Sequence, residues 1–149
     1  MGEAARGGVS GQRFPWGNTI NQSQANYQSY WIGGVPNFSF DVNSTSGYHP
    51  MFNDAVLPYT SPVGYFAPNG YGLFDMAGNV WEWCWDWYGT YSGSSQTDPR
   101  GPVSSSYRVI RSSAYDVNAF SCRTADRYIN DPAFANFGLG FRCVLPAAP

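Results

Sequence analysis

The 149-residue sequence contains no lysine, and charged residues of all kinds make up only 12% of it. The eight cationic side chains are all arginines, and the net charge is −2. No arginine lies between Arg13 and Arg100, whereas that interval holds acids from Asp41 to Asp98. A nucleic-acid-binding protein needs a basic patch or stripe. The composition therefore argues against a nucleic-acid partner and suits a bound cation in the middle of the chain.

The sequence also lacks a long apolar run, and no signal-peptide pattern follows Met1, so we expect no membrane span. Its three cysteines, Cys84, Cys122 and Cys143, are an odd number without CxxC spacing. A zinc site is therefore not expected, and at most one intrachain disulfide can form. His49 stands alone in a turn-like stretch. A catalytic triad would depend on it, and its neighbours give no support for one.

Aromatic residues are abundant, at 18% of the chain, and 17 glycines and 11 prolines interrupt it closely. Few windows carry apolar residues at helical spacing, so we expect short strands, few helices and many loops. The length predicts one domain, residues 1–149, with a real core. The pattern predicts a short helix over residues 22–30. It predicts strands at residues 72–74, 80–87, 108–110 and 140–144.

Residues 69–83, NGYGLFDMAGNVWEW, are the most informative stretch. Three glycines and two tryptophans accompany just two acids, Asp75 and Glu82. Glycine allows backbone geometries that other residues resist. Carboxylates and the carbonyls of a turn are the hard oxygen ligands from which proteins build Ca²⁺ sites. Trp81 and Trp83 would share one face of a strand. On composition alone, a glycine turn that leads into a core strand is the simpler interpretation.

This run closely resembles the signature of the formylglycine-generating, or sulfatase-modifying, family, a variant of the C-type-lectin fold. Other segments match that family in the expected order and extend the resemblance over nearly the whole chain. They are EAARGG (3–8), RFPWGNTINQSQANY (13–27), YTSPVGYFAPNGYGLFDMAGNVWEWCWDWY (59–88), DPRGP (98–102) and GLGFRCV (138–144). The resemblance implies an α+β, C-type-lectin-like fold of the formylglycine-generating-enzyme subtype, loop-rich with short strands and few helices.

Family members usually carry, before EAARGG, a long segment that supplies strands and a helix of the same domain. This chain starts within what is normally the end of that helix, so we expect a domain that lacks the usual N-terminal segment. A naturally minimal version and a fragment are both open. A fragment would leave apolar surface uncovered, which favours self-association.

Members with formylglycine-generating activity carry two redox cysteines that bind copper and oxidise a substrate cysteine. That chemistry needs thiolates, because Cu(I) prefers sulfur ligands and a thiolate can form a mixed disulfide with substrate. In the matching element, residues 108–128, Val117 or a neighbour takes the place of the first redox cysteine. Cys122 and Cys143 match structural positions of the family. We therefore expect no copper and lean against enzyme activity. The alternative is a formylglycine-generating oxidase, or a degenerate or partial relative of one.

The resemblance also implies a structural Ca²⁺ ion at the motif DMAGNVWE. The ligands carried over are Asp75, Gly78, Val80 and Glu82, the two middle ones through backbone carbonyls. Such an ion would hold the glycine turn against the tryptophan-rich strand, because a multidentate cation can replace packing in a loop-rich fold. The alternative is that Glu82 pairs with a buried arginine. A second family site would use Asn26 and Tyr27, but its nearest acid, Asp54, is out of register.

Residues 112–138 depart from the family pattern, while arginines and Cys122 among them keep its register. Where the family often has Asn or a Gly-Gly-Ser-Trp element, this chain has residues that are reached by changing the adenines of an Asn codon. This resembles the variable proteins of diversity-generating retroelements, which use the same lectin-type fold. In those proteins a C-terminal region is rewritten while the scaffold stays fixed. Ordinary drift in a polar loop and a structural module of a larger assembly are the alternatives.

The resemblance implies non-catalytic recognition of a protein or glycan through this segment. Tyr and Phe offer large contact area with few rotatable bonds, and Ser, Asn and Gly offer adaptable hydrogen bonding. We expect Arg111, Arg123 and Arg127 to pin the loops, by bonds to Asp131 or to backbone carbonyls. The predicted ligand-binding residues, with the aromatic ones as anchors, are Tyr115, Asp116, Val117, Phe120, Ser121, Asp126, Tyr128, Ile129, Phe134, Asn136 and Phe137.

Overall fold

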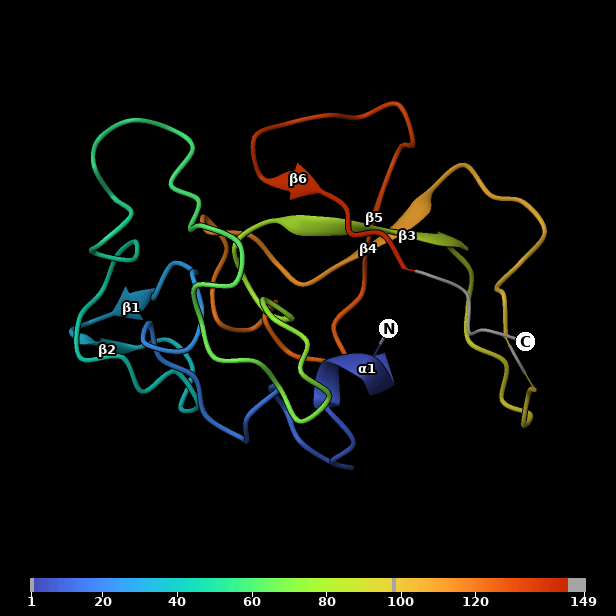
Figure 1. Cartoon of the computed structure of the whole chain (residues 1–149), viewed down its shortest axis with the longest axis horizontal. Helices are drawn as coiled ribbons and strands as arrows, with labels where there is room; N and C mark the ends of the chain where they lie inside the picture. Colours follow the sequence, from blue (N-terminus) through green and yellow to red (C-terminus); the bar gives the residue numbers. More distant parts are fainter. Residues whose placement is uncertain (1, 98, 145–149) are drawn as a thin grey trace.

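The structure is a computed structural model that describes residues 2–97 and 99–144. Asp98, at the start of the DPRGP match, lies outside these ranges, as do Met1 and residues 145–149 of the predicted domain. The described residues form one short helix and six short strands joined by long loops (Figure 1). These elements are α1 (Gly2–Arg6), β1 (Trp31–Ile32), β2 (Val35–Pro36), β3 (Trp81–Trp87), β4 (Arg108–Arg111), β5 (Tyr128–Asn130) and β6 (Leu139–Gly140).

The main sheet has four strands in the order β5-β4-β3-β6. β4 pairs antiparallel with both β3 and β5, whereas β6 pairs parallel with β3. Within β3, the pairing with β4 shifts register between Trp83 and Trp87. Such an irregularity bends a strand and increases its twist. Because the tryptophan-rich β3 lies between β4 and β6, the glycine turn that precedes it reaches the middle of the sheet.

A separate hairpin, β1–β2, lies away from this sheet on the left of Figure 1. Its two-residue loop is Gly33–Gly34, and both glycines have positive φ, 62° and 84°. Tight two-residue hairpins need positive φ at both central positions, which glycine adopts without steric cost. The sequence GG between Ile32 and Val35 therefore explains the hairpin.

The core lies beside the sheet and is assembled from distant parts of the chain. Its fully buried members are Phe14, Ile20, Ala25, Tyr27, Ala77, Ala119 and Cys122. Aromatic rings close it from the outside: Phe14 stacks on Trp16 at 6.1 Å and packs against Phe40 at 5.8 Å between ring centroids. Residues from positions 14 to 122 thus share one hydrophobic cluster, and none of them belongs to a helix or a strand of the described chain.

Loop-rich α+β architecture is confirmed, and the strands predicted at residues 80–87 and 108–110 correspond to β3 and β4. Of the strand predicted at 140–144, only Gly140 pairs, in β6. The strand predicted at 72–74 is wrong. Asn69 Oδ1 accepts hydrogen bonds from the backbone N–H groups of Tyr71 and Leu73, at 2.9 and 3.1 Å, and this turn holds the chain away from any neighbouring strand.

The helix predicted over residues 22–30 is also wrong: the segment is a turn followed by isolated bridges. Asn21 Oδ1 accepts the Ser23 N–H at 2.9 Å, and the Gln22 amide donates to the Tyr27 and Gly47 carbonyls, both at 2.9 Å. Polar side chains that bond to nearby backbone compete with helical bonds. No helix of the described residues is long and apolar enough to cross a membrane.

Candidate functional site

The glycine turn, residues 75–80, is wedged between two other parts of the chain. Gly78 has φ +79°, and a Cβ atom there would overlap the carbonyl oxygen of Asn26. The Gly78 N–H donates to the Ser112 carbonyl at 2.5 Å, and the Asn79 N–H donates to the Asn26 carbonyl at 2.8 Å. Only glycine fits this position, because the backbone of Asn26 occupies the space of a side chain.

Asn79 connects this turn to the segment that was predicted to vary. Its Oδ1 accepts the Ser61 N–H at 2.8 Å and its Nδ2 donates to the Ser61 carbonyl at 3.2 Å. Its own carbonyl accepts the Tyr115 N–H at 2.9 Å. Asn79 was not singled out in the sequence. Its position after Gly78 was the available signal, since asparagine is one of the few residues that tolerate positive φ, here 71°.

Of the two carboxylates predicted to bind Ca²⁺, Asp75 has the surroundings that better fit a bound cation. Its Oδ2 accepts the Gly64 N–H at 2.6 Å, while its Oδ1 is buried and has no hydrogen-bond partner among the described residues. The Gly78 carbonyl accepts the Val80 N–H at 3.1 Å. A buried carboxylate oxygen without a partner is costly, and a bound cation would relieve that cost. Asp75 therefore fits the ligand role.

Glu82 fits that role less well, because its carboxylate is held by Arg142. The Arg142 Nε donates to Glu82 Oε2 at 2.5 Å, and Nη2 contacts the second oxygen. The same guanidinium donates to the Phe74 and Asp75 carbonyls, both at 2.9 Å. The hydrogen bond to Glu82 raises the pKa of Arg142 above its usual range. The arginine pairing that the sequence left open is present, and a Ca²⁺ ion would have to share Glu82 with it.

No cluster of three or more His, Cys, Asp or Glu side chains that could hold a metal occurs within residues 2–97 and 99–144. The cation predicted at the glycine turn would therefore depend on backbone carbonyls besides Asp75 and Glu82. Loops can supply such carbonyls to Ca²⁺, which takes six to eight oxygen ligands in flexible geometry.

The segment that was predicted to vary, residues 112–138, is called the variable segment below, and it presents most of its predicted contacts to solvent. Phe137 is 73% exposed, Tyr128 59% and Phe134 45%. Asp116 and Asn136 are exposed as well. Four other predicted contact residues are half-buried: Val117, Ser121, Asp126 and Ile129.

Tyr115 was predicted to be an anchor on this surface, and the structure corrects its position. Its side chain is only 5% exposed and its ring packs edge-on against Tyr59 at 6.0 Å. The reason is its backbone N–H bond to Asn79, which draws the residue into the glycine turn's network. Tyr115 therefore belongs to the scaffold rather than to the solvent-facing surface.

The exposed aromatic residues of the variable segment lie in three places. Phe120 contacts Phe38 at 5.5 Å between centroids and lies under the Arg123 guanidinium, 3.4 Å from the ring centroid. Tyr128 instead contacts Trp81 at 5.7 Å, across the main sheet. Phe134 and Phe137 lie in the loop between β5 and β6, at the top of Figure 1.

That loop, residues 131–138, is called the outer loop below. Its backbone is held at both ends: the Ala133 N–H donates to Asp131 Oδ1 at 2.9 Å, and the Gly138 N–H donates to Asn136 Oδ1 at 3.0 Å. The Gly138 carbonyl accepts the Trp81 N–H at 2.7 Å, which ties the loop to β3. Short polar side chains thus hold the loop backbone at both ends, and the two phenylalanine side chains are exposed to solvent.

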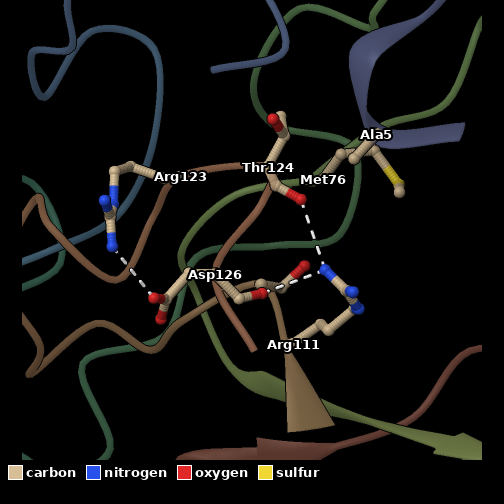
Figure 2. A pocket seen from close by; sticks show the side chains of 7 residues that line it. Ala5, Met76, Arg111, Arg123, Thr124 and Asp126 are labelled. Atoms are coloured by element: carbon tan, nitrogen blue, oxygen red, sulfur yellow. Dashed lines mark hydrogen bonds and ion pairs between the residues drawn. The ribbon is translucent and has the colours of Figure 1, made fainter. Parts of the chain in front are cut away.

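Three arginines pin the variable segment to its surroundings, as predicted. Arg111 donates to the Thr124 and Asp126 carbonyls at 3.3 and 3.0 Å (Figure 2). Arg123 pairs with the Asp126 carboxylate at 3.1 Å. Arg127 donates to the Gly89 carbonyl at 2.8 Å. Charge-assisted bonds of this kind are stronger than neutral ones. The partners are backbone carbonyls and Asp126, whereas none of these bonds goes to Asp131.

Figure 2 also shows the small cavity beneath Arg111, which is lined by Ala5, Met76, Thr124 and their neighbours. Its volume of about 10 Å³ is room for about one water molecule. Burial raises the pKa of the Asp126 carboxyl at its edge, and the nearby Arg123 charge opposes that rise. The cavity is therefore a small gap in the packing around Arg111 and Arg123, and it is too small for a ligand.

Of the three thiols, Cys143 is exposed, whereas Cys84 and Cys122 are shielded from solvent to different degrees. Cys122 is 1% exposed, and burial raises its pKa to about 12. Burial likewise raises the pKa of the half-buried Cys84. No disulfide joins cysteines of the described chain. Val117, which with its neighbours was matched to the position of the first redox cysteine, donates its N–H to the Ala114 carbonyl at 3.1 Å. Because the thiolate is the reactive form, Cys122 is a structural residue.

Comparison with known proteins completes this picture. The sheet, the loops and the glycine turn define a C-type-lectin-like domain of the formylglycine-generating-enzyme subtype. The chain belongs to the family of the sulfatase-modifying factor enzyme 1-like domain, whose model matches residues 2–147.

Its relatives include enzymes, an inactive homologue and a variable protein. The formylglycine-generating enzyme of Thermomonospora curvata is 37% identical over 148 residues, which cover 94% of this chain and 45% of the enzyme. The inactive C-alpha-formylglycine-generating enzyme 2 of Mus musculus is 35% identical over 150 residues, covering 97% and 40%. The solved structure of Treponema denticola variable protein 1 superposes with a TM-score of 0.66 at 31% identity, covering 94% and 42%. The chain thus spans less than half the length of each.

Proposed function

We propose that this chain is a non-catalytic recognition domain that binds a protein or glycan through the exposed side chains of the variable segment. The observation that carries the proposal is the exposure of Tyr128, Phe134 and Phe137 on a backbone fixed by other residues. Similarity to a solved variable protein supports it. Exposed side chains on a backbone that other residues hold are free to change, which is what a diversified binding surface requires.

The chemistry of the surface agrees with this role. The cations of the variable segment are engaged internally, as shown for Arg123 by Asp126 and Phe120 and for Arg127 by Gly89 and Tyr91. What the segment offers to a partner is therefore aromatic, amide and carboxylate groups. Rigid aromatic side chains lose little conformational entropy when they bind, and they dominate binding hot spots.

The first test is the DNA that flanks the gene. We expect a near-copy of the sequence for residues 112–138 that differs only where the copy has adenine. The differences should fall on the codons of Phe134 and Phe137, and those of the buried Ala119 and Cys122 should be unchanged. Absence of a near-copy, or differences spread equally over exposed and buried codons, would contradict programmed variation.

An oxidase is the second candidate, because relatives include formylglycine-generating enzymes at 37% identity. Its test is copper binding by the purified protein together with conversion of a cysteine-containing peptide to the aldehyde. We expect neither. Stoichiometric copper binding together with turnover of the peptide would contradict the recognition proposal and support an oxidase.

We further propose that a structural Ca²⁺ ion binds at the glycine turn through Asp75, Glu82 and the carbonyls of Gly78 and Val80. The buried, unpartnered Oδ1 of Asp75 supports this site. The ion's charge would offset the cost of burying that oxygen, and it would brace the turn that holds β3 and Tyr115. Its role would be to stabilise the fold, with no part in a reaction.

A further inference from the structure

A cavity separate from the variable segment opens on the surface of the scaffold. Its volume is about 420 Å³, and it is formed by residues 22–23, 43–45, 49–51 and 65–66. Ligand pockets for small molecules typically have volumes of about 300 to 1,000 Å³. This cavity is therefore large enough for a ligand of the size of a monosaccharide or a disaccharide, and no residue of the variable segment lines it.

Uncharged hydrogen-bonding groups form part of its lining. The hydroxyl groups of Ser44 and Thr45 line the cavity and make no hydrogen bond to any described residue. They stand on a rigid amide frame: Asn43 Nδ2 donates to Gln22 Oε1 at 2.9 Å and to the Thr45 carbonyl at 2.7 Å. Gln22 is in turn bonded to the Tyr27 and Gly47 carbonyls. The backbone carbonyl of Thr45 is thus held by this network, and the exposed hydroxyl groups of Ser44 and Thr45 are open to a ligand.

Apolar side chains form the rest of the lining. Met51 and Tyr65 are 66% and 45% exposed and contact each other through the Tyr65 hydroxyl and the Met51 sulfur at 3.0 Å. The buried Phe66 lies behind them and contacts Tyr65 at 5.0 Å between centroids. Aromatic rings and a thioether can pack against the C–H face of a ligand.

The cavity carries no formal charge at neutral pH. No Asp, Glu or Arg residue lines it. The His49 imidazole, which also lines the cavity, is held in the neutral form: Nδ1 accepts the Met51 N–H at 3.3 Å, so Nε2 carries the proton and donates to the Gln22 carbonyl at 2.6 Å. Burial lowers the pKa of His49, in the same direction. Anions therefore find no counter-charge there, while a purely apolar ligand would leave the hydroxyls of Ser44 and Thr45 unbonded.

We propose that this cavity binds a neutral saccharide, whose hydroxyl groups bond to Ser44 and Thr45 and whose apolar ring face packs on Tyr65 and Met51. A sugar ring offers both kinds of surface, which is the combination that the lining presents. The site belongs to the scaffold, so it is independent of whatever the variable segment recognises.

The test is a titration of the isotopically labelled protein, followed by NMR, with glucose, galactose and N-acetylglucosamine in turn. We expect at least one of them to bind with a dissociation constant in the millimolar range and to shift the signals of Ser44, Thr45 and Tyr65. Thr45→Val removes one hydroxyl at nearly constant shape, and we expect it to weaken binding about fivefold, the equivalent of one hydrogen bond.

Matched variants make the result specific. Ser44→Ala removes the second hydroxyl should Thr45→Val fail to fold, and Tyr65→Ala should abolish binding. Tyr71→Ala, at an exposed tyrosine that does not line the cavity, and Phe137→Ala, in the outer loop, should both leave it unchanged. The proposal is overturned if none of the three sugars binds at millimolar concentrations, if folded hydroxyl variants bind as the parent does, or if the shifted signals lie in the variable segment.

Discussion

The glycine turn and the outer loop both adjoin β3, yet their side chains have opposite roles. In the glycine turn, Asn79 points inward and its amide bonds to the backbone of Ser61, while Gly78 has no room for a side chain at all. In the outer loop, Phe134 and Phe137 point to solvent and the backbone is closed by Asp131 and Asn136. In the glycine turn, packing determines which residue each position accepts. In the outer loop, only a few polar residues hold the backbone conformation.

This difference shows how one small domain can combine positions that packing constrains with positions that tolerate substitution. The first residues of the variable segment belong to the constant part: Ser112 accepts the Gly78 N–H and Tyr115 donates to Asn79. Exposure then increases towards Phe134 and Phe137. A substitution should therefore cost more folding free energy at the start of the segment than near its end.

The largest effect is expected at Gly78. Gly78→Ala should destabilise the fold by about 4 kcal/mol, because the methyl group meets the Asn26 carbonyl and alanine resists positive φ. Gly72→Ala is the matched control: its φ of +72° is similar, but nothing lies within 4 Å of the added atom, so only about 1 kcal/mol should be lost. Chemical denaturation of both variants measures the difference. Equal losses would mean that the close approach to Asn26 does not constrain the turn.

Calcium gives the next largest effect. At about 100 times its dissociation constant, Ca²⁺ should raise the free energy of unfolding by about 2.7 kcal/mol, because it binds only the folded state. Asp75→Asn should remove most of this gain, and Asp86→Asn, at an exposed acid with no part in the site, should keep it. Thermal unfolding with Ca²⁺, with Mg²⁺ and with a chelator provides the measurement. Identical transitions in all three would rule out the ion.

Ser112 and Ser113 lie where the variable segment meets the glycine turn, and their backbone is strained. Their φ angles are 81° and 73°, in the left-handed region that costs a serine about 1 to 2 kcal/mol. Ser112→Gly and Ser113→Gly should therefore each stabilise the protein by about 1 kcal/mol once the greater flexibility of unfolded glycine is subtracted. Ser104→Gly, at an exposed serine without positive φ, should not stabilise it. Loss of stability in both test variants would show that the serine side chains contribute more than the strain costs.

The sequence predicted the architecture well where a local pattern has a local cause. Alternating tryptophans predicted β3, and the motif order over nearly the whole chain predicted the fold. It failed over residues 22–30 because Gln22 bonds to Gly47, a partner 25 positions away. The resemblance to variable proteins led to the exposed Phe134 and Phe137, but the burial of Tyr115 depends on Asn79, a contact that no spacing in the sequence reveals. Side chain networks between distant loops were the part that could not be predicted.

The smallest effect on folding, and the sharpest on function, is expected in the outer loop. Phe137→Ala and Phe134→Ala should change the free energy of unfolding by no more than about 0.5 kcal/mol, because exposed side chains away from caps and networks contribute little. Phe14→Ala, at a fully buried ring, should cost about 3 to 5 kcal/mol in the same denaturation experiment. If the outer-loop variants were as unstable as Phe14→Ala, these rings would be part of the core, and a freely variable surface could not lie there. If they are stable, any loss of binding to a captured partner can be assigned to the missing ring itself.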